Sequence, residues 1–177
     1  MAGARGLAAV LDGTARLWVQ DDTPDAEARY RVRFWFDPND FTAGSGTKKV
    51  QILQAFSQDP KLKKMVALFV RGSASGYEVM AKVREDGAGM RTTGWKQMSN
   101  APHAIEIDWT KASAPGAGDG HLQLWLDGTS VALLSNLDNA SRFLDMVRLG
   151  VPAVRPSTSG TVYFDRFVSR RASYIGP

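Results

Sequence analysis

Arginine and aromatic residues alternate with hydrophobic ones along the strongest strand pattern of the chain, residues 27–36 (EARYRVRFWF). Arg31, Arg33 and Trp35 occupy every second position there. Because the side chains of a β-strand alternate between its two faces, this set is expected on the face opposite the core. An indole ring stacks on a sugar ring and a guanidinium group binds hydroxyls or carboxylates, so the face suits a glycan.

Two further strand patterns carry the same kinds of side chain. Lys82 and Arg84 stand at alternate positions of one, and Gln123 and Trp125 stand at alternate positions of the other. We therefore predict a ligand-binding sheet face built from the outward residues Arg31, Arg33, Trp35, Lys82, Arg84, Gln123, Trp125 and Tyr163.

Carboxylates offer an alternative reading of the same arginines. Glu106 and Asp108 alternate in HAIEIDW (103–109), and Asp165 lies in a later strand pattern. These acids would pair with the arginines across strands, and the tryptophans would then lie against a neighbouring loop or module. Both readings stay open at this point.

Serine nucleophiles lack a recognisable motif. The only histidines, His103 and His121, stand at the starts of strand patterns. Residues 72–76 (GSASG) imitate the Gly-x-Ser-x-Gly elbow, but no helix pattern follows them. We therefore expect a flexible loop there and no serine triad.

Oxygen-bearing residues beside a proline raise the question of calcium. Asp37, Asn39 and Asp40 in FDPND, and Asp165 in YFDRF, would supply oxygens to a structural calcium ion. Neither segment has the spacing of a dedicated calcium loop, and such residues commonly form turns. We expect no cofactor, with these four as the calcium candidates.

Antiparallel strands must position all of these residues. Strand patterns recur about every dozen residues, with glycine, proline, aspartate or serine between them, and Asp127-Gly128 is typical of a tight hairpin turn. We expect a charged loop at 61–64 and a weak helical turn at 139–145. The predicted strands lie at 7–11, 16–20, 27–36, 49–57, 65–71, 76–84, 90–98, 103–109, 120–126, 131–134, 146–150 and 160–170.

About a dozen strands without crossover helices predict an all-β fold, a two-sheet antiparallel jelly-roll sandwich. Inward-facing hydrophobic residues should form its core. They are Tyr30, Val32, Phe34, Phe36, Val66, Leu68, Val70, Val79, Val83, Ile105, Ile107, Trp109, Leu122, Leu124, Leu126, Val162 and Phe164.

Length and composition favour one soluble domain over residues 1–177. Apolar residues make up 44% and charged residues 23%, which is ordinary for a globular protein. The absence of cysteine excludes disulfides and thiolate sites. No stretch approaches the roughly 20 apolar residues of a membrane span. The formal charge of +4 weakly favours an anionic partner, but no nucleic-acid-binding motif occurs.

The order of motifs resembles the concanavalin A-like lectin/glucanase superfamily, and within it the laminin-G-like jelly-roll modules of secreted and surface-attached bacterial proteins. The resemblance spans about Leu7 to Ile175. It is carried by RYRVRFWFDPNDFT (29–42), HAIEIDW (103–109), GHLQLWLDG (120–128), LDNASRFLDMVRLG (137–150) and SGTVYFDRFVSRRASYIG (159–176). The resemblance implies the fold, whereas members of the superfamily include lectins, adhesion domains and glycoside hydrolases.

Glycoside hydrolysis can be tested against one motif of that superfamily. Laminarinase-type hydrolases carry Glu-x-Asp-x-x-Glu on one strand, which projects both catalytic carboxylates into the cleft. Glu106 and Asp108 match the first positions, but Lys111 stands where the second glutamate belongs. The pair therefore lacks its acid, and we predict that the chain is not an enzyme.

The resulting prediction is a non-catalytic carbohydrate-binding or cell-surface adhesion module, with a glycan or a neighbouring surface protein as partner. The second hypothesis is a structural or assembly module in which Trp18, Trp35 or Trp125 is buried against another subunit. A glycoside hydrolase-like protein without the full motif is the third. An extracellular or cell-surface location is expected if a signal lies upstream.

Overall fold

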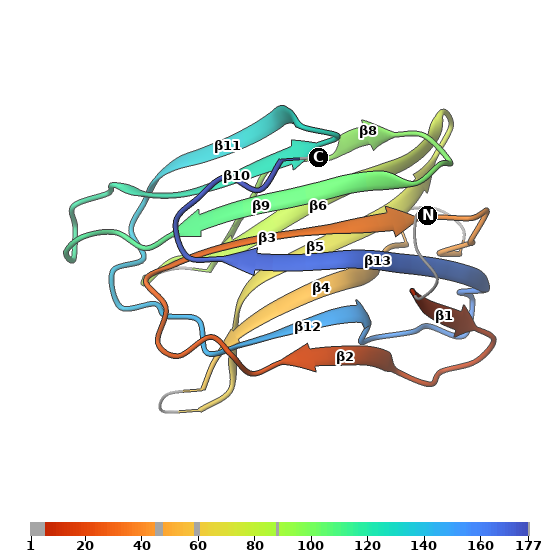
Figure 1. Cartoon of the computed structure of the whole chain (residues 1–177), viewed down its shortest axis with the longest axis horizontal. Coiled ribbons are helices and arrows are strands. Elements are labelled where there is room, and N and C mark those ends of the chain that lie inside the picture. Colours follow the sequence, from red (N-terminus) through yellow and green to blue (C-terminus); the bar gives the residue numbers. More distant parts are fainter. Residues whose placement is uncertain (1–5, 45–47, 59–60, 88, 177) are drawn as a thin grey trace.

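The computed structural model describes residues 6–44, 48–58, 61–87 and 89–176, and there the chain forms thirteen strands and no helix. The strands make two antiparallel sheets that lie one behind the other in Figure 1. The predicted all-β jelly-roll sandwich is confirmed. Within the described part of the chain, no helix is long and apolar enough to cross a bilayer.

The first sheet has six strands, all antiparallel to their neighbours. Its central strand β3 pairs with β9 so that Arg31 lies opposite Asp108 and Arg33 opposite Glu106. The order across the sheet is β1 (Leu7–Leu11), β13 (Gly160–Arg170), β3 (Arg29–Asp37), β9 (His103–Thr110), β10 (Gly120–Leu126) and β11 (Thr129–Leu137).

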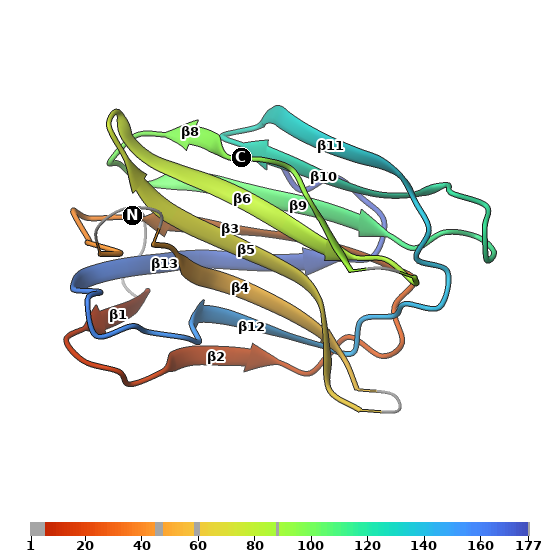
Figure 2. The ribbon, with the colours of Figure 1, turned by 180° about the vertical axis from the view of Figure 1, so that it is seen from behind.

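The second sheet has seven strands. It lies in front in Figure 2, which views the molecule from behind. The short strands β7 and β8 both pair with β6, one after the other along its length. The strands are β2 (Leu17–Asp21), β12 (Met146–Val151), β4 (Val50–Ser57), β5 (Lys63–Ser73), β6 (Gly76–Arg84), β7 (Met90–Thr92) and β8 (Lys96–Met98).

The hydrophobic core fills the space between the sheets. Every residue predicted for it is buried there, because period-two alternation directs one side of each strand inward. Strand β4 departs from simple alternation. A register irregularity between Gln51 and Leu53 accompanies burial of two consecutive side chains, Ile52 and Leu53, in the same core.

The helical turn predicted at 139–145 is wrong. Polar side chains of this segment bond to other segments instead of to their own backbone. Asn139, fully buried, accepts the Ala112 N–H at 2.7 Å, and the Ser141 hydroxyl donates to Asp86 at 2.6 Å. The segment therefore links neighbouring loops, and its backbone makes a single turn, closed by the Arg142 N–H and the Asn139 carbonyl at 3.0 Å, without a helix.

Two turns follow from residues that tolerate positive φ. Asp127 (φ 51°) and Gly128 (φ 78°) form the predicted tight turn between β10 and β11. The predicted strand 90–98 is interrupted at Gly94 (φ 70°), which separates β7 from β8.

Gly150 lies in β12 opposite Trp18 of the edge strand β2, and we expect this position not to tolerate a larger residue. Its φ is 132°, and an added Cβ would lie 2.4 Å from the Leu17 carbonyl oxygen. We expect Gly150→Ala to lower the free energy of unfolding by about 1–3 kcal/mol, measured by urea denaturation. Gly13→Ala, where an added Cβ meets nothing within 4 Å, is the control. Equal losses for both variants would contradict this reading.

Candidate functional site

The eight predicted ligand-binding residues divide between the outer sides of two sheets. Lys82 and Arg84 lie on β6 of the seven-stranded sheet. The other six belong to the six-stranded sheet and are Arg31, Arg33, Trp35, Gln123, Trp125 and Tyr163. The structure therefore does not bring the eight residues together at one place.

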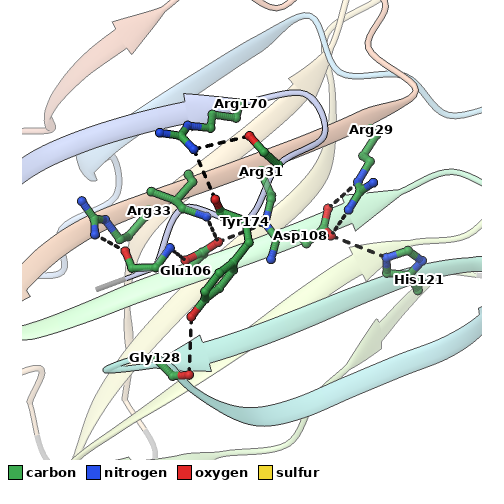
Figure 3. Close-up of polar contacts among 12 residues, drawn as sticks. Arg29, Arg31, Arg33, Glu106, Asp108, His121, Gly128, Arg170 and Tyr174 are labelled. Atoms are coloured by element: carbon green, nitrogen blue, oxygen red, sulfur yellow. Dashed lines mark hydrogen bonds and ion pairs between the residues drawn. The ribbon is translucent and has the colours of Figure 1, made fainter.

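On the six-stranded sheet Arg29 and Arg31 pair with carboxylates of the neighbouring strand (Figure 3). The Arg31 Nε donates to Glu106 Oε1 at 3.0 Å, and its Nη1 lies 3.1 Å from Asp108 Oδ2. Arg29 Nη2 lies 2.6 Å from the same Asp108 oxygen. The side chains of Arg31, Glu106 and Asp108 are at most 7% exposed. Cross-strand pairing, the second of the two readings, is what the geometry shows here.

The C-terminal tail, residues 171–176, covers this ion cluster. Its Ile175 and Gly176 N–H groups donate to Glu106 at 3.2 and 3.1 Å, and Arg33 donates to the Gly176 carbonyl. The Tyr174 ring packs against Trp125, with the Arg31 guanidinium 4.7 Å from the Trp125 centroid and 5.0 Å from that of Tyr174. The tail therefore covers the part of this face that holds Arg31 and Glu106 (Figure 3).

The same geometry removes Glu106 and Asp108 from hydrolytic chemistry. Both carboxylates are held by arginines, and Lys111, at the position of the missing glutamate, has its ammonium 3.8 Å from the Phe143 ring centroid. A nucleophile or an acid must be free to reach a substrate. A glycoside hydrolase built on this pair is not supported.

Asp108 makes the fold sensitive to acid. Burial alone would raise the pKa of Asp108, but the His121 and Arg29 side chains and the charge of Arg31 outweigh burial and lower this pKa to about 2. An unfolded aspartate titrates at about 3.9, so this stabilisation is complete above that pH and is lost as the pH falls toward about 2. We expect the thermal midpoint to fall over this interval. Asp108→Asn should flatten that part of the profile, and identical profiles would contradict the assignment.

The outer face of the seven-stranded sheet carries a second group of cations. Its cations are interspersed with aromatic rings and amides, and among the residues that define it only Glu78 is acidic. We call it the basic face. It consists of Lys49, Lys64, Arg71, Lys82, Arg84 and Arg148 with Trp18, Phe56, Phe69, Trp95, Gln51, Gln54 and Glu78.

Strand register assembles the basic face. Across β5 and β6, Ala67 lies opposite Lys82 and Phe69 opposite Met80, in alternation with core residues of the same strands. Across β4 and β12, Gln54 lies opposite Arg148. Outward positions of strands far apart in sequence therefore meet on one surface.

Aromatic rings hold several of these cations in place. The Arg148 guanidinium lies 5.1 Å from the ring centroids of both Trp18 and Phe56. The Lys82 ammonium lies 5.6 Å from the Phe69 ring, and Lys49 lies 5.3 Å from the same ring. Cation–π contacts orient a charge without neutralising it, so these cations keep their attraction for an anion.

At the centre of the face, one oxygen gathers two donors. Gln51 Oε1 accepts a hydrogen bond from Gln54 Nε2 and one from Lys64 Nζ at 3.2 Å. Burial and the nearby Arg84 charge lower the pKa of Lys64. Lys64 is therefore a better proton acceptor than an exposed lysine.

Lys49 shows how crowded the cations are. Burial and the charges of Lys82, Arg155 and Arg71 lower the pKa of Lys49. Arg71 is paired with Glu78 at 2.7 Å, and its guanidinium lies 4.2 Å from the Trp95 centroid. Cations brought together with one carboxylate repel one another, and an anionic ligand would relieve that repulsion.

Sequence reasoning identified only part of the basic face. It selected Lys82 and Arg84 but missed Lys49, Arg71 and Arg148. The expected charged loop at 61–64 is also incorrect at its end, because β5 begins at Lys63 and includes Lys64. The sequence does show Gln51, Phe69 and Arg148 alternating with core residues. Only the order of the strands in the sheet reveals that these residues share one surface.

The four calcium candidates make hydrogen bonds within the protein, and Asn39 Nδ2 donates to the Thr161 carbonyl at 3.1 Å. Asp37 Oδ1 accepts the Asn39 N–H at 3.0 Å, and Asp165 Oδ1 accepts the N–H of the next residue at 2.8 Å. Asp40 is bonded to Asn100 through its side chain and its N–H. Among the described residues, no group of three or more histidine or acidic side chains is arranged to hold a metal ion.

Comparison with known proteins finds the same fold in several solved structures of low sequence identity. No family model and no curated protein matches the sequence. The alginate lyase Aly36B, as a mutant in complex with an alginate trisaccharide, is 13% identical with a TM-score of 0.67, covering 95% of this chain and 82% of that one. The alginate lyase vAL-1 from Chlorella virus is 13% identical with a TM-score of 0.64, covering 97% and 87%. A pentraxin from Limulus polyphemus is 11% identical with a TM-score of 0.58, covering 96% and 77%.

These likenesses support a jelly-roll sandwich and leave the finer laminin-G assignment a proposal. They also correct two functional predictions, the non-catalytic module and the statement that the chain is not an enzyme. Several structures that share the fold are alginate lyases. The reasoning failed because a missing glutamate excludes only hydrolysis by a carboxylate pair, and a lyase acts by elimination.

Proposed function

We propose that this chain cleaves an anionic polysaccharide on its basic face by β-elimination. The observation that carries the proposal is the set of cations and aromatic rings on the outer face of the seven-stranded sheet, where six basic side chains accompany Glu78. The fold likeness to alginate lyases supports the same class of substrate.

An extended polyanion is complementary to the charges and aromatic rings of this face. Lys49 and Lys82 flank the Phe69 ring, and Arg148 lies between Trp18 and Phe56. Rings stack on the apolar sides of sugars, while cations bind carboxylates. The face therefore supplies two basic, aromatic patches, one on β5 and β6 and one on β12 and β2, with the amides of β4 between them.

Elimination in a polymer of acidic sugars needs three catalytic roles. A donor must neutralise the sugar carboxylate, which makes the proton on the adjacent carbon acidic. A base must remove that proton, and the departing glycosidic oxygen must receive one. The carbon–hydrogen and carbon–oxygen bonds break and a carbon–carbon double bond forms.

The centre of the basic face has side chains for these roles. Arg148 is assigned to the sugar carboxylate, and its register partner Gln54, which is buried, positions Gln51. Lys64 and Gln54 both donate a hydrogen bond to Gln51 Oε1, and we assign Lys64 as the base. Its amine takes the proton from carbon and passes it to the leaving oxygen, so one group serves both steps.

The test is incubation of the protein with alginate, polygalacturonate and the neutral glucan laminarin. Cleavage by elimination should release new reducing ends together with ultraviolet absorbance from the conjugated double bond, for an acidic polymer only. Reducing ends without that absorbance would indicate hydrolysis, and no cleavage of any acidic polymer would overturn the proposal.

Charge reversal on the face should weaken binding. We expect Lys82→Glu to reduce retention in alginate affinity electrophoresis about tenfold at low salt, because an attraction becomes a repulsion. Arg16→Glu, an exposed position in the β1–β2 connection, changes the net charge equally and should leave retention almost unaltered. The difference should shrink at high salt. Equal effects of the two variants would mean that binding follows net charge alone.

Two sequence predictions remain part of this proposal. They are the single domain over residues 1–177 and the extracellular or cell-surface location, where acidic polysaccharides are met. Limited proteolysis that leaves residues 6–176 intact would support the first.

A further inference from the structure

At one end of the sandwich a serine, a histidine and an aspartate are connected in series. Ser99 Oγ lies 2.9 Å from His103 Nε2, and His103 Nδ1 lies 2.6 Å from Asp127 Oδ2. Ser99 follows β8, His103 begins β9, and Asp127 begins the turn after β10. We propose that these residues form a second active site, a serine nucleophile with its base, that hydrolyses short acyl esters.

The hydrogen-bond network assigns the histidine proton. The short contact between His103 and the Asp127 carboxylate places a proton on Nδ1. Nε2 lies 2.9 Å from Ser99 Oγ and 3.3 Å from the Ser99 carbonyl oxygen, and we assign it as the acceptor of the Ser99 hydroxyl. The other Asp127 oxygen accepts the Ala104 N–H at 2.8 Å, which fixes the carboxylate. His103 is 9% exposed and Ser99 is exposed, so the base is sheltered and the nucleophile is accessible.

A cavity of about 290 Å³ is lined by Asn100, the residue that follows Ser99. Phe41 and Tyr77, whose rings stack with centroids 5.1 Å apart, line it together with Gly76 and Asn100. A Cβ added at Gly76 would lie 3.5 Å from both the Ser99 Cα and the Asn100 nitrogen, so the cavity wall reaches the nucleophile's backbone. The cavity suits a small acyl group, and the Asn100 N–H, directly after the nucleophile, is the donor we assign to the oxyanion.

The reaction balances without a cofactor. Ser99 Oγ attacks the acyl carbon while its proton passes to His103 Nε2. The ester carbon–oxygen bond then breaks, and the imidazolium proton goes to the departing alcohol oxygen. Water, deprotonated by His103, attacks the acyl-serine, and the acid leaves with Ser99 restored. Asp127 is a positioning residue, since it contacts only the histidine ring and the backbone.

The basic face takes no part in this chemistry, so the two proposals fail separately. The proposal departs from the expectation of no serine triad, which stays a prediction that the experiment below tests. The arrangement has no Gly-x-Ser-x-Gly elbow, and its aspartate was recognised in the sequence only as a turn residue.

The test uses the full chain with a fluorophosphonate probe and p-nitrophenyl acetate. We expect the probe to label Ser99, identified by peptide mass spectrometry, and Ser99→Ala to lower labelling and ester hydrolysis by about 10²-fold or more. Ser75→Ala, an exposed serine in the β5–β6 turn, should behave as the wild type. Equal labelling of wild type and Ser99→Ala, or label on another residue only, would overturn the proposal.

Asp127→Asn separates positioning from folding. Asparagine tolerates the positive φ of 51° at this position, so the turn and the thermal midpoint should be kept. The labelling rate should nevertheless fall, because an amide no longer holds the proton on Nδ1. An unchanged labelling rate with an unchanged midpoint would contradict the role of Asp127.

Discussion

Replacing Lys64 with alanine is expected to lower the rate of polysaccharide cleavage by about 10²–10⁴-fold, the usual effect of losing a general base. The reason is that Lys64 carries both proton transfers of the proposed elimination, with its pKa lowered by burial and by Arg84. Binding should change little, because Arg148 holds the sugar carboxylate. Steady-state kinetics on the acidic polymer should therefore show a fall in kcat with a nearly constant KM.

Two further variants make this test specific. Lys63→Ala removes an adjacent but exposed ammonium and should keep the wild-type rate. Lys64→Arg retains the positive charge but loses the base, so it should be nearly as inactive as alanine. Full activity in Lys64→Arg would show that the residue supplies charge alone, and full activity in Lys64→Ala would remove it from the mechanism.

Glu106→Ala is expected to lower the free energy of unfolding by about 3–5 kcal/mol, the cost of leaving a buried ion pair without one partner. Glu106 is 3% exposed and joins Arg31 to the tail amides of Ile175 and Gly176. Its loss leaves the Arg31 guanidinium buried with Asp108 as its remaining carboxylate and frees the tail. Urea denaturation measures the loss, and proteolysis after Arg171 reports on the tail.

The matched control is an ion pair in the same tail that is exposed. Arg171 pairs with Glu27 at 2.7 Å with its own side chain 51% exposed, so Arg171→Ala should cost only about 0–1 kcal/mol. Glu106→Gln, which keeps the acceptor oxygen but not the charge, should fall between the two. A loss below about 1 kcal/mol for Glu106→Ala would show that the cluster does not hold the tail.

The core was predictable because hydrophobic residues at every second position mark the side of a strand that faces inward. Val32, Ile107 and Leu124 needed only their own neighbours in the sequence to be placed. The same alternation placed Arg31 on the opposite side of its strand, also as the structure has it. Alternation cannot say what covers an outward residue, and here the cover comes from the far end of the chain, through Tyr174 and Gly176.

The basic face and the serine site depend on register, which local patterns do not contain. Gln54 and Arg148 meet because β12 pairs with β4, although the two strands lie far apart in sequence. Ser99 and His103 are close in sequence, but Asp127 joins them only through the β9–β10 pairing. Each residue was visible in the sequence, and its partners were not.

The most direct test of the account is amide chemical-shift mapping of the labelled protein titrated with alginate oligosaccharides. We predict shifts concentrated on β4, β5, β6 and β12, with the largest near Gln54, Lys64 and Arg148. Shifts confined to the six-stranded sheet and its tail, or none at concentrations that support cleavage, would contradict the claim that the basic face receives the polysaccharide.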